Sequence, residues 1–244
     1  MKTFILMWNP AISSYTWQRF KEDQEEICND DWYEGVGNWS VWDYNEVEED
    51  DRFFMVKVGE GKTGIVMAGY FCSGPYEDED WSGKGRPTRY ADLTIQAQID
   101  PDLADIITTE ELTKEIPDFD WTGGHSGRLL DETSAEKLEL LWLKYINKIR
   151  FNKKANAVFI KDINELSAVA ERYFSRHKGH TCEKCGYNFQ KVFGDDCEET
   201  VPYRLYLSEN DKEPVSEDEL LSRVKCICYN CNIILEDELI YNEL

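Results

Sequence analysis

Two Cys-x-x-Cys pairs constrain the fold of this chain more than any other feature of its sequence. The first pair is Cys182 and Cys185, and the second is Cys228 and Cys231. Each pair places two sulfur atoms on one tight turn, and two such turns complete a tetrahedral zinc shell. Two matched pairs disfavour a redox dithiol, and a shell of four sulfurs leaves no position open for catalysis. The sequence therefore predicts a structural zinc site in its last third.

Cys197 and Cys226 lie near these pairs in the sequence, so a ligand set that includes one of them stays open.

Zinc-bound thiolates require reduced cysteines. The apolar run Phe4–Trp8 is ended by Asn9 and Pro10 before it reaches the length of a signal-peptide core. No stretch has the length of a membrane span. We therefore expect a cytoplasmic protein that does not associate with membranes.

The charge of the chain is strongly negative but unevenly distributed. Its 244 residues hold 27 Lys and Arg against 49 Asp and Glu, a formal net charge of -22, which argues against indiscriminate binding to nucleic acid. Residues 144–191 nevertheless hold eleven Lys and Arg against four acids, whereas residues 192–244 hold four against fourteen. The basic segment is either a solvated helix face or a contact for a phosphate backbone. The candidate backbone contacts are Lys153, Lys154, Lys161, Arg172, Arg176, Lys178, Lys184 and Lys191.

Apolar periodicity and composition predict an α+β fold with two domains, 1–150 and 151–244, which meet near the polar stretch 147–156. The expected strands of the first domain are Thr3–Trp8, Phe53–Val58, Gly64–Cys72 and Tyr90–Ile99, with a hairpin between the second and third. The expected helices are Tyr15–Ile27, a segment from Thr133 or Ser134 to Ile149, and, opening the second domain, Asp162–His177.

The second domain resembles the zinc-containing HNH endonucleases from Lys161 to Glu236. Those enzymes open with a basic helix, a Cys-x-x-Cys-Gly turn, an aromatic pair and a glycine. Here these are the helix before His180, the turn Cys182–Gly186, Tyr187 with Phe189, and Gly194. The resemblance implies a small ββα-like domain with a four-cysteine zinc site.

The chain departs from this family at the residues that perform the chemistry. Active members carry two adjacent histidines after the glycine, one for the catalytic metal and one to activate water. Pro202 and Tyr203 stand there instead, and no histidine follows His180. The other family positions hold Arg223, Asn232 and Glu236. We therefore predict no catalytic residues and a module that keeps the zinc-stapled fold after losing nuclease chemistry.

The first domain resembles the PUA-like superfamily, which includes the EVE and YTH domains. The resemblance lies in the strand Ile5–Asn9, the aromatic stretch Gly37–Trp42, the strands around Phe53 and Val66, and the helix after Leu130. It implies a partly closed β-barrel with flanking helices. Such domains hold a flipped modified base in an aromatic pocket, where the base needs faces to stack on. An EVE-like domain fused to an HNH-like domain resembles modification-dependent restriction proteins.

The candidate base-binding residues are aromatic, with polar neighbours. Each tryptophan could equally serve the core. The candidate walls are Trp39, Trp42, Trp81 and Trp121, and the candidate polar contacts are Asn38, Ser40, Asp120 and His125.

Three functions remain open at this point. The first is a DNA-binding reader of a modified base. The second is an active metal-dependent endonuclease that uses Asp195, Asp196, Glu198 and Glu199 in place of the lost histidines. The third is an acidic interaction protein or DNA mimic, which would use Glu46–Asp51 and Glu77–Asp80.

Overall fold

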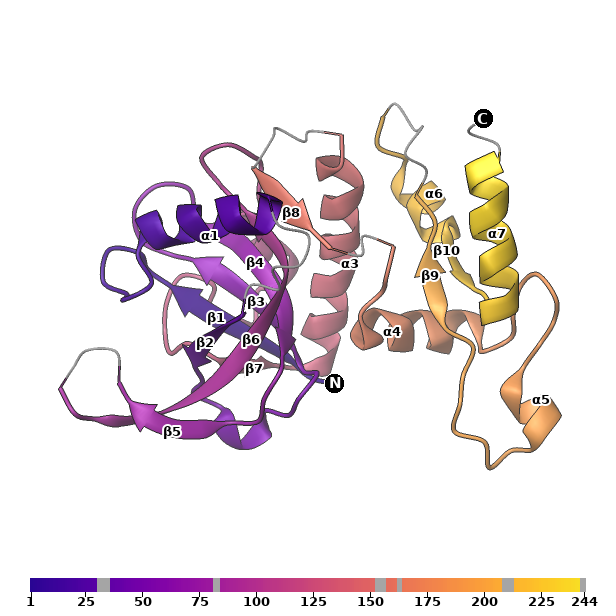
Figure 1. The fold of residues 1–244 in the computed structure, drawn as a ribbon, viewed down its shortest axis with the longest axis horizontal. Coiled ribbons are helices and arrows are strands. Elements are labelled where there is room, and N and C mark those ends of the chain that lie inside the picture. Colours follow the sequence, from indigo (N-terminus) through magenta and orange to yellow (C-terminus); the bar gives the residue numbers. More distant parts are fainter. Residues whose placement is uncertain (30–35, 81–83, 152–156, 162–163, 208–212, 242–244) are drawn as a thin grey trace. The chain divides into compact units, whose positions relative to one another are not determined.

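The computed structural model describes residues 1–29, 36–80, 84–151, 157–161, 164–207 and 213–241 (Figure 1). The chain forms two compact units. The first comprises Met1–Tyr145 and Asn152–Asp162, and the second comprises Ile146–Phe151 and Ile163–Leu244.

A curled mixed sheet forms the centre of the first unit. Its main path runs β2–β6–β4–β3–β1–β7, and β5 and β8 also pair with β6. β1 and β3 are parallel, whereas the other pairs are antiparallel. The strands are β1 (Thr3–Trp8), β2 (Val36–Ser40), β3 (Arg52–Lys57), β4 (Gly64–Phe71), β5 (Tyr76–Glu79), β6 (Pro87–Ile99), β7 (Arg128–Leu130) and β8 (Val158–Ile160).

The predicted strands and the β3–β4 hairpin are confirmed, as is the mixed α+β class. The last predicted strand is longer than expected, because β6 begins at Pro87. Its thirteen residues allow it to pair with β2, β4, β5 and β8 in turn. The residues after 150 were expected in the second domain, whereas β8 pairs with β6 and is a strand of the first unit.

Two irregularities of register curl the sheet toward a half-barrel (Figure 1). The pairing of β3 with β4 shifts between Met55 and Val56, and that of β4 with β6 shifts between Ala68 and Gly69. An extra residue on one strand bends that strand and increases its twist. Gln96 is the extra residue on β6.

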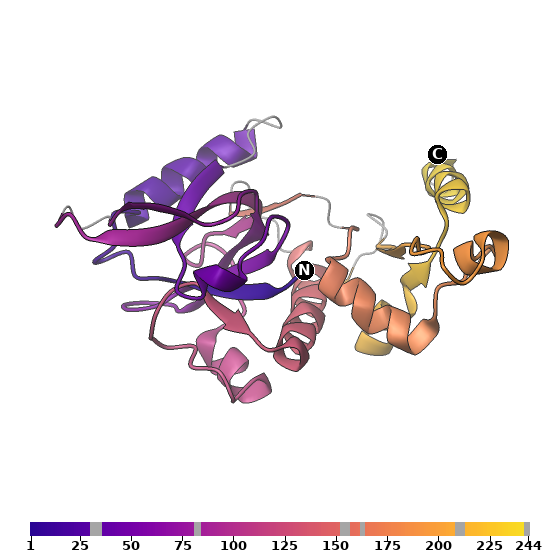
Figure 2. The same ribbon diagram turned by 90° about the horizontal axis from the view of Figure 1, so that it is seen from below.

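Helices cover both faces of the central strands. Every residue of β1 and β3 is buried, as expected for strands that are covered on both sides. Phe20 of α1 stacks on Trp8, with ring centroids 5.0 Å apart, and Trp142 of α3 lies 5.5 Å from Phe54. Phe54 is in register with Ile5, and the side chains of Ile5 and Trp8 point to opposite faces of the sheet. α1 and α3 therefore cover opposite faces. Figure 2 shows these helices from a second direction. They are α1 (Trp17–Asn29), α2 (Thr109–Glu115) and α3 (Glu132–Ile149), with a 3-10 turn at Tyr44–Glu46.

A buried ion pair joins β3 to α3. Arg52 Nε donates to Glu139 Oε1 at 3.0 Å, and Arg52 Nη1 donates to Gln96 Oε1 at 2.7 Å. The guanidinium lies 4.6 Å from the ring centroid of Phe54 and 4.9 Å from that of Tyr70. The two charged side chains are only 1% and 3% exposed. Partners on every side thus compensate the loss of water around this charge.

The second unit combines short helices with a two-stranded antiparallel sheet, in which Tyr203 faces Cys226. The Ser167 side chain accepts a hydrogen bond from Ala170 N, so α4 begins at Ala168 and not at Asp162 as predicted. In the described part of the chain, no helix combines the length and apolar character that crossing a bilayer requires. The elements are α4 (Ala168–Lys178), α5 (Phe189–Phe193), β9 (Tyr203–Leu205), α6 (Glu217–Ser222), β10 (Val224–Cys226) and α7 (Tyr229–Tyr241).

Candidate functional site

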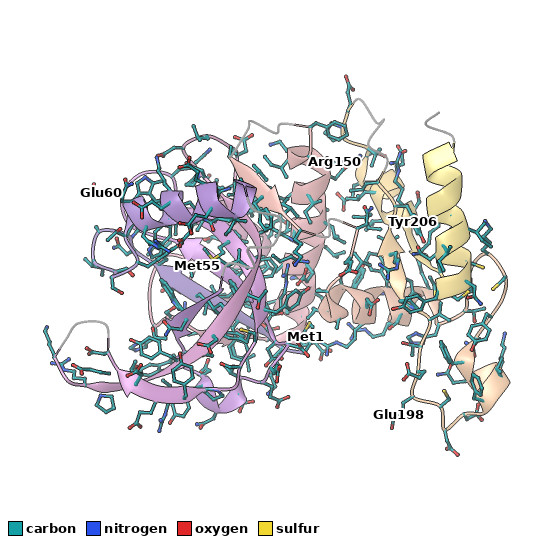
Figure 3. The ribbon with its side chains drawn as sticks, viewed as in Figure 1. Met1, Met55, Glu60, Arg150, Glu198 and Tyr206 are labelled. Atoms are coloured by element: carbon teal, nitrogen blue, oxygen red, sulfur yellow. The ribbon has the colours of Figure 1, made fainter. Side chains whose placement is uncertain are left out.

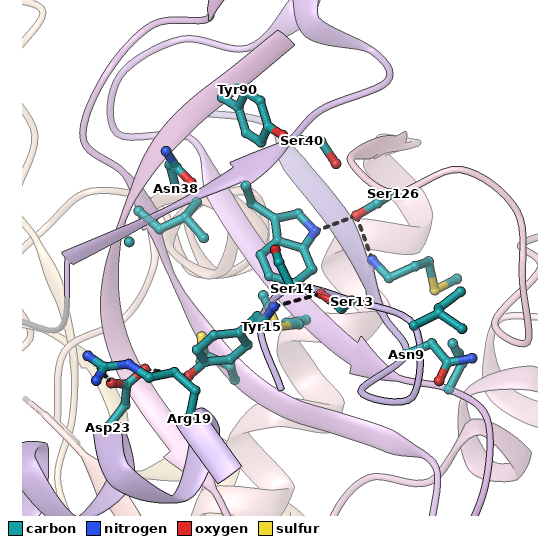
Figure 4. A pocket seen from close by; sticks show the side chains of 18 of the residues that line it. Asn9, Ser13, Ser14, Tyr15, Arg19, Asp23, Asn38, Ser40, Tyr90 and Ser126 are labelled. Carbon is teal, nitrogen blue, oxygen red and sulfur yellow. Dashed lines mark hydrogen bonds and ion pairs between the residues drawn. The ribbon is translucent and has the colours of Figure 1, made fainter. Parts of the chain in front are cut away.

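The first unit contains a pocket of about 800 Å³ beside the start of α1 (Figure 4). A volume of this order is typical of small-molecule sites, which are mainly apolar with a few polar groups. Buried apolar side chains of the strands form one wall, namely Met7, Met55, Met67, Leu93 and Ile95. Met55 lies within the sheet in Figure 3. Polar side chains line much of the rest, among them Asn9, Ser13, Ser14, Asn38, Ser40 and Ser126.

Trp39 lines this pocket from β2. Its indole Nε1 donates to Ser126 Oγ at 2.7 Å, and the same oxygen accepts from Met7 N at 2.8 Å. The ring meets Tyr15 edge to face, with centroids 6.1 Å apart. The hydrogen bond and the ring contact hold the indole in one orientation, so the pocket is formed before a ligand binds.

Gly127 fixes the loop that carries Ser126. Its φ is +73°, and a Cβ atom there would lie 2.5 Å from Val41 Cα. We expect Gly127→Ala to destabilise the first unit by about 1–3 kcal/mol through overpacking and backbone strain. The displaced loop would also weaken the bond between Ser126 and Trp39. Urea unfolding measures the first effect, and unchanged stability would contradict the packing described here. Gly74→Ala is the control, because no atom lies within 4 Å of the Cβ position of Gly74.

The other predicted tryptophan walls lie elsewhere. Trp121 is 1% exposed, and its Nε1 donates to the carbonyl of Ile116, the C-cap of α2, at 2.9 Å. Trp121 therefore belongs to the core, where its indole N–H satisfies the carbonyl at the end of α2. Trp42 is 56% exposed and stacks on His125 at a centroid distance of 3.5 Å. Neither tryptophan is among the described residues that line the pocket, and Trp81 lies outside the described residues.

The predicted polar contacts divide in the same way. Asn38 and Ser40 line the pocket. Asp120 instead accepts hydrogen bonds from the backbone and hydroxyl of Thr122, at 3.0 and 2.9 Å. The backbone bond from Thr122 leads the causes that lower the pKa of Asp120. This carboxylate thus shapes the glycine-rich loop.

A polar cluster that the sequence analysis missed closes one end of the pocket (Figure 4). Tyr15 Oη donates to Asp23 Oδ2 at 2.8 Å, and Arg19 Nη2 lies 2.8 Å from Asp23 Oδ1. Arg19 and Asp23 lie four residues apart on one face of α1, and Tyr15 lies in the segment just before that helix. That spacing, at the start of a predicted helix, was the signal available in the sequence. Burial raises the pKa of Asp23, and the bond from Tyr15 and the charge of Arg19 oppose this shift.

The predicted zinc ligands come together in the second unit. The sulfur atoms of Cys182, Cys185, Cys228 and Cys231 all lie within 4.8 Å of one another. Cys185 Sγ and Cys228 Sγ are 3.7 Å apart. This arrangement is compatible with a metal site.

Local backbone geometry builds each half of this cluster. Gly186 N donates to Cys182 O at 2.9 Å, and Cys182 N donates to Tyr187 O at 2.8 Å, which closes the first turn. Gly186 has a φ of +74°, which explains a glycine at the end of this turn. The second pair lies where β10 passes into α7, and Cys228 N points at Cys182 Sγ from 3.4 Å.

The electrostatics of the cluster favour a bound cation. Burial raises the pKa of Cys231 to about 12, and the thiols of Cys185, Cys228 and Cys182 add to this shift. Burial also raises the pKa of Cys182, but backbone N–H groups, led by that of Cys228, lower it to about 6. Four thiolates this close repel one another, so they ionise together only when a cation binds them.

The alternative ligands lie apart from this cluster. Cys226 is buried, and its Sγ lies 3.5 Å from Val201 O. Within the described residues, the candidate metal group includes neither Cys226 nor Cys197. The two Cys-x-x-Cys pairs are therefore the four-cysteine group that the fold assembles.

Pro202 and Tyr203, the residues compared with the nuclease histidines, make structural contacts. Tyr203 is buried, and its hydroxyl donates to the carbonyl of Gly179. Pro202 O accepts a hydrogen bond from Ile227 N at 3.0 Å. Asn232 Oδ1 accepts from Tyr206 Oη at 2.7 Å. These contacts tie the strands and α7 together.

The other residues compared with that family belong to no candidate metal group in the described part of the chain. Arg223 forms an ion pair with Glu219 at 2.8 Å, and the side chain of Glu236 lies outside the described part. The four carboxylates of the endonuclease alternative are exposed, as Figure 3 shows for Glu198. They are Asp195, Asp196, Glu198 and Glu199.

The predicted backbone contacts are distributed over both units. Lys153 and Lys154 lie outside the described residues, and Lys161 follows β8 in the first unit. Lys178 Nζ donates to the carbonyls of Val224 and Leu221, at 2.5 and 3.2 Å, so it stabilises the fold of the second unit. The other four are exposed in the second unit, namely Arg172 and Arg176 on α4, Lys184 in the first cysteine turn and Lys191 on α5.

No family model matches this sequence, and no curated protein matches it. Solved structures similar to the chain include a protein from Pseudomonas syringae, with a TM-score of 0.31 and 13% identity over 47% of this chain and 78% of that one. A hypothetical protein from Leishmania major has a TM-score of 0.33 and 12% identity, over 72% of this chain and 94% of its own. An NMR structure from Rhodopseudomonas palustris has a TM-score of 0.29 and 17% identity, over 48% and 73% of the two chains. Likeness at this level assigns neither a family nor an activity.

Proposed function

We propose that this protein binds DNA that carries a modified base. The first unit is a PUA-like reader that holds the base, extruded from the duplex, in the pocket beside Trp39. The second unit is an HNH-derived module that is held together by zinc and contacts the phosphate backbone without cutting it.

The observation that carries this proposal is the pocket itself. About 800 Å³ of space lies against a tryptophan that Ser126 holds in place, with an apolar wall on one side and serine and asparagine side chains on another. An extruded base needs a surface to stack on and polar groups for its edge. The curled half-barrel around the pocket is the shape that a PUA-like domain would have.

Zinc is the cation that best fits the four-cysteine cluster. A tetrahedron with metal–sulfur bonds of about 2.3 Å has sulfur–sulfur edges of about 3.8 Å, and the distance between Cys185 Sγ and Cys228 Sγ is 3.7 Å. Four cysteine ligands fill the coordination shell, so the ion would stabilise the fold and take no part in a reaction. Arg172, Arg176, Lys184 and Lys191 would then supply positive charge to the phosphate backbone.

Loss of nuclease chemistry is supported by the contacts of Tyr203. Its hydroxyl donates to a backbone carbonyl inside the unit, and neither it nor Pro202 can supply the imidazole that activates water. Binding without hydrolysis is the function that these residues support best.

Binding to a fluorescent duplex with a single 5-hydroxymethylcytosine, compared with unmodified DNA, tests this function. We expect tighter binding to the modified duplex. We also expect Trp39→Ala to weaken that binding by about 1–3 kcal/mol, a factor of about 5–150, through loss of stacking. Trp42→Ala is the matched control, because Trp42 is exposed and is not among the described pocket residues. Equal binding of the wild type to unmodified DNA and to duplexes with either 5-hydroxymethylcytosine or N6-methyladenine, or cleavage with Mg²⁺ or Mn²⁺, would contradict the proposal.

A further inference from the structure

The polar cluster of Tyr15, Arg19 and Asp23 at one end of the pocket indicates which chemical groups an occupant would carry. Asp23 lines the pocket and is 9% exposed. Tyr15 Oη donates to its Oδ2, and Arg19 forms an ion pair with its Oδ1 at 2.8 Å. This carboxylate is thus held in a fixed position at the pocket wall (Figure 4).

Asp23 retains unused capacity as an acceptor. Oδ1 is covered and lies 2.8 Å from Arg19 Nη2, whereas Oδ2 accepts one hydrogen bond from the described residues, that of Tyr15 Oη. An ionised carboxylate accepts hydrogen bonds and cannot donate them, and each oxygen offers two lone pairs. Oδ2 therefore keeps a second lone pair, which an N–H group of the pocket's occupant would fill.

The exocyclic group of a base distinguishes the possible occupants. Cytosine presents an N4 amine and adenine an N6 amine, both donors, whereas uracil and hypoxanthine present a carbonyl oxygen at the same place. A carbonyl oxygen against the carboxylate would place two acceptors together with no proton between them, which is costly. Asp78 and Glu79 also line the pocket, so its charge disfavours an anionic ligand such as a free phosphate.

We propose that Asp23 selects the base: it accepts a hydrogen bond from the exocyclic amine, so the pocket takes an amine-bearing base and rejects the keto analogue. This inference rests on the proposed function and specifies its substrate class. Tyr15 and Arg19 act as positioning residues, because they orient the carboxylate.

Pairs of probes that exchange the exocyclic amine for a carbonyl oxygen, with the accompanying proton on the adjacent ring nitrogen, test the proposal. The cytosine arm compares duplexes containing 5-hydroxymethylcytosine and 5-hydroxymethyluracil, and the adenine arm compares N6-methyladenine with hypoxanthine. We expect the full-length protein to prefer the amine-bearing member of at least one pair by about 10- to 100-fold. The arm that shows the preference identifies the class of base.

Variants assign the preference to Asp23. Asp23→Asn, whose amide both donates and accepts, should reduce the preference to below about threefold, whereas Asp78→Asn at the same pocket should keep it. Tyr15→Phe retains the carboxylate and removes one of its supports, so it should reduce the preference in part. Far-UV circular dichroism establishes that each variant is folded.

The outcomes separate this inference from the proposed function. Equal affinity of the wild-type protein for both members of each pair, together with loss of binding in Trp39→Ala, would overturn the role of Asp23 and leave the reader intact. A preference that persists in a folded Asp23→Asn protein would also overturn it. If no probe binds more tightly than unmodified DNA and Trp39→Ala changes nothing, both proposals fall.

Discussion

Replacement of Cys231 by serine is expected to abolish metal binding and to unfold the second unit. The four sulfurs lie within 4.8 Å of one another, on segments that are otherwise joined by short helices and a two-stranded sheet. So small a core depends on its metal. Structural zinc contributes about 10–16 kcal/mol of apparent binding free energy in zinc-finger peptides at pH 7, and this energy is also folding energy. Elemental analysis should find one zinc per chain in the wild type and none in the variant.

Amide hydrogen exchange measures how far the second unit unfolds when the metal is lost. Amides of β9, β10 and the start of α7 should lose their protection in Cys231→Ser and after treatment of the wild type with a strong chelator. Cys197→Ser is the matched control, because Cys197 lies outside the candidate metal group of the described residues. A full zinc equivalent in Cys231→Ser, or unchanged protection after chelation, would contradict a structural zinc site.

Replacement of Glu139 by leucine is expected to destabilise the first unit by about 3–5 kcal/mol. Arg52 would remain buried with its charge uncompensated, and removing one member of a buried pair costs about this much. The pair is 1% and 3% exposed, so water cannot take the place of the lost carboxylate. All eight tryptophans precede residue 145, so tryptophan fluorescence during urea unfolding reports on the first unit alone.

The double variant Arg52→Met/Glu139→Leu distinguishes the charge from the packing. Replacing a buried ion pair by apolar side chains of similar volume is often neutral, so most of the lost stability should return. A double variant less stable than Glu139→Leu would mean that the contacts of Arg52 with Phe54, Tyr70 and Gln96 dominate. A single variant as stable as the wild type would contradict the buried environment of the pair.

The four-cysteine cluster could be predicted from the sequence because its signal is local. Two cysteines on one turn share a fixed geometry, and two such turns complete each other wherever the chain brings them together. The strands β1, β3 and β4 could be predicted equally well, since each is a mainly apolar run between turn residues. Burial of all residues in β1 and β3 agrees with that pattern.

The pocket could be predicted only in part, because distant segments assemble it. Ser126, which holds Trp39, also bonds to Met7, 119 positions away in the sequence. Trp121 lies in a glycine-rich loop that resembles a binding loop, yet its indole satisfies the carbonyl of Ile116 in the core. No local pattern distinguishes these two tryptophans. The spacing of four between Tyr15, Arg19 and Asp23 was present in the sequence, but only the fold brings these residues to the wall of a pocket.

A crystal structure of the protein with a duplex containing one 5-hydroxymethylcytosine tests the central claim most directly. The proposal predicts density for the modified base outside the duplex, inside the pocket, with its ring against Trp39 and its amine toward Asp23. A modified base that remains stacked in the duplex, with DNA bound and the pocket empty, would contradict it.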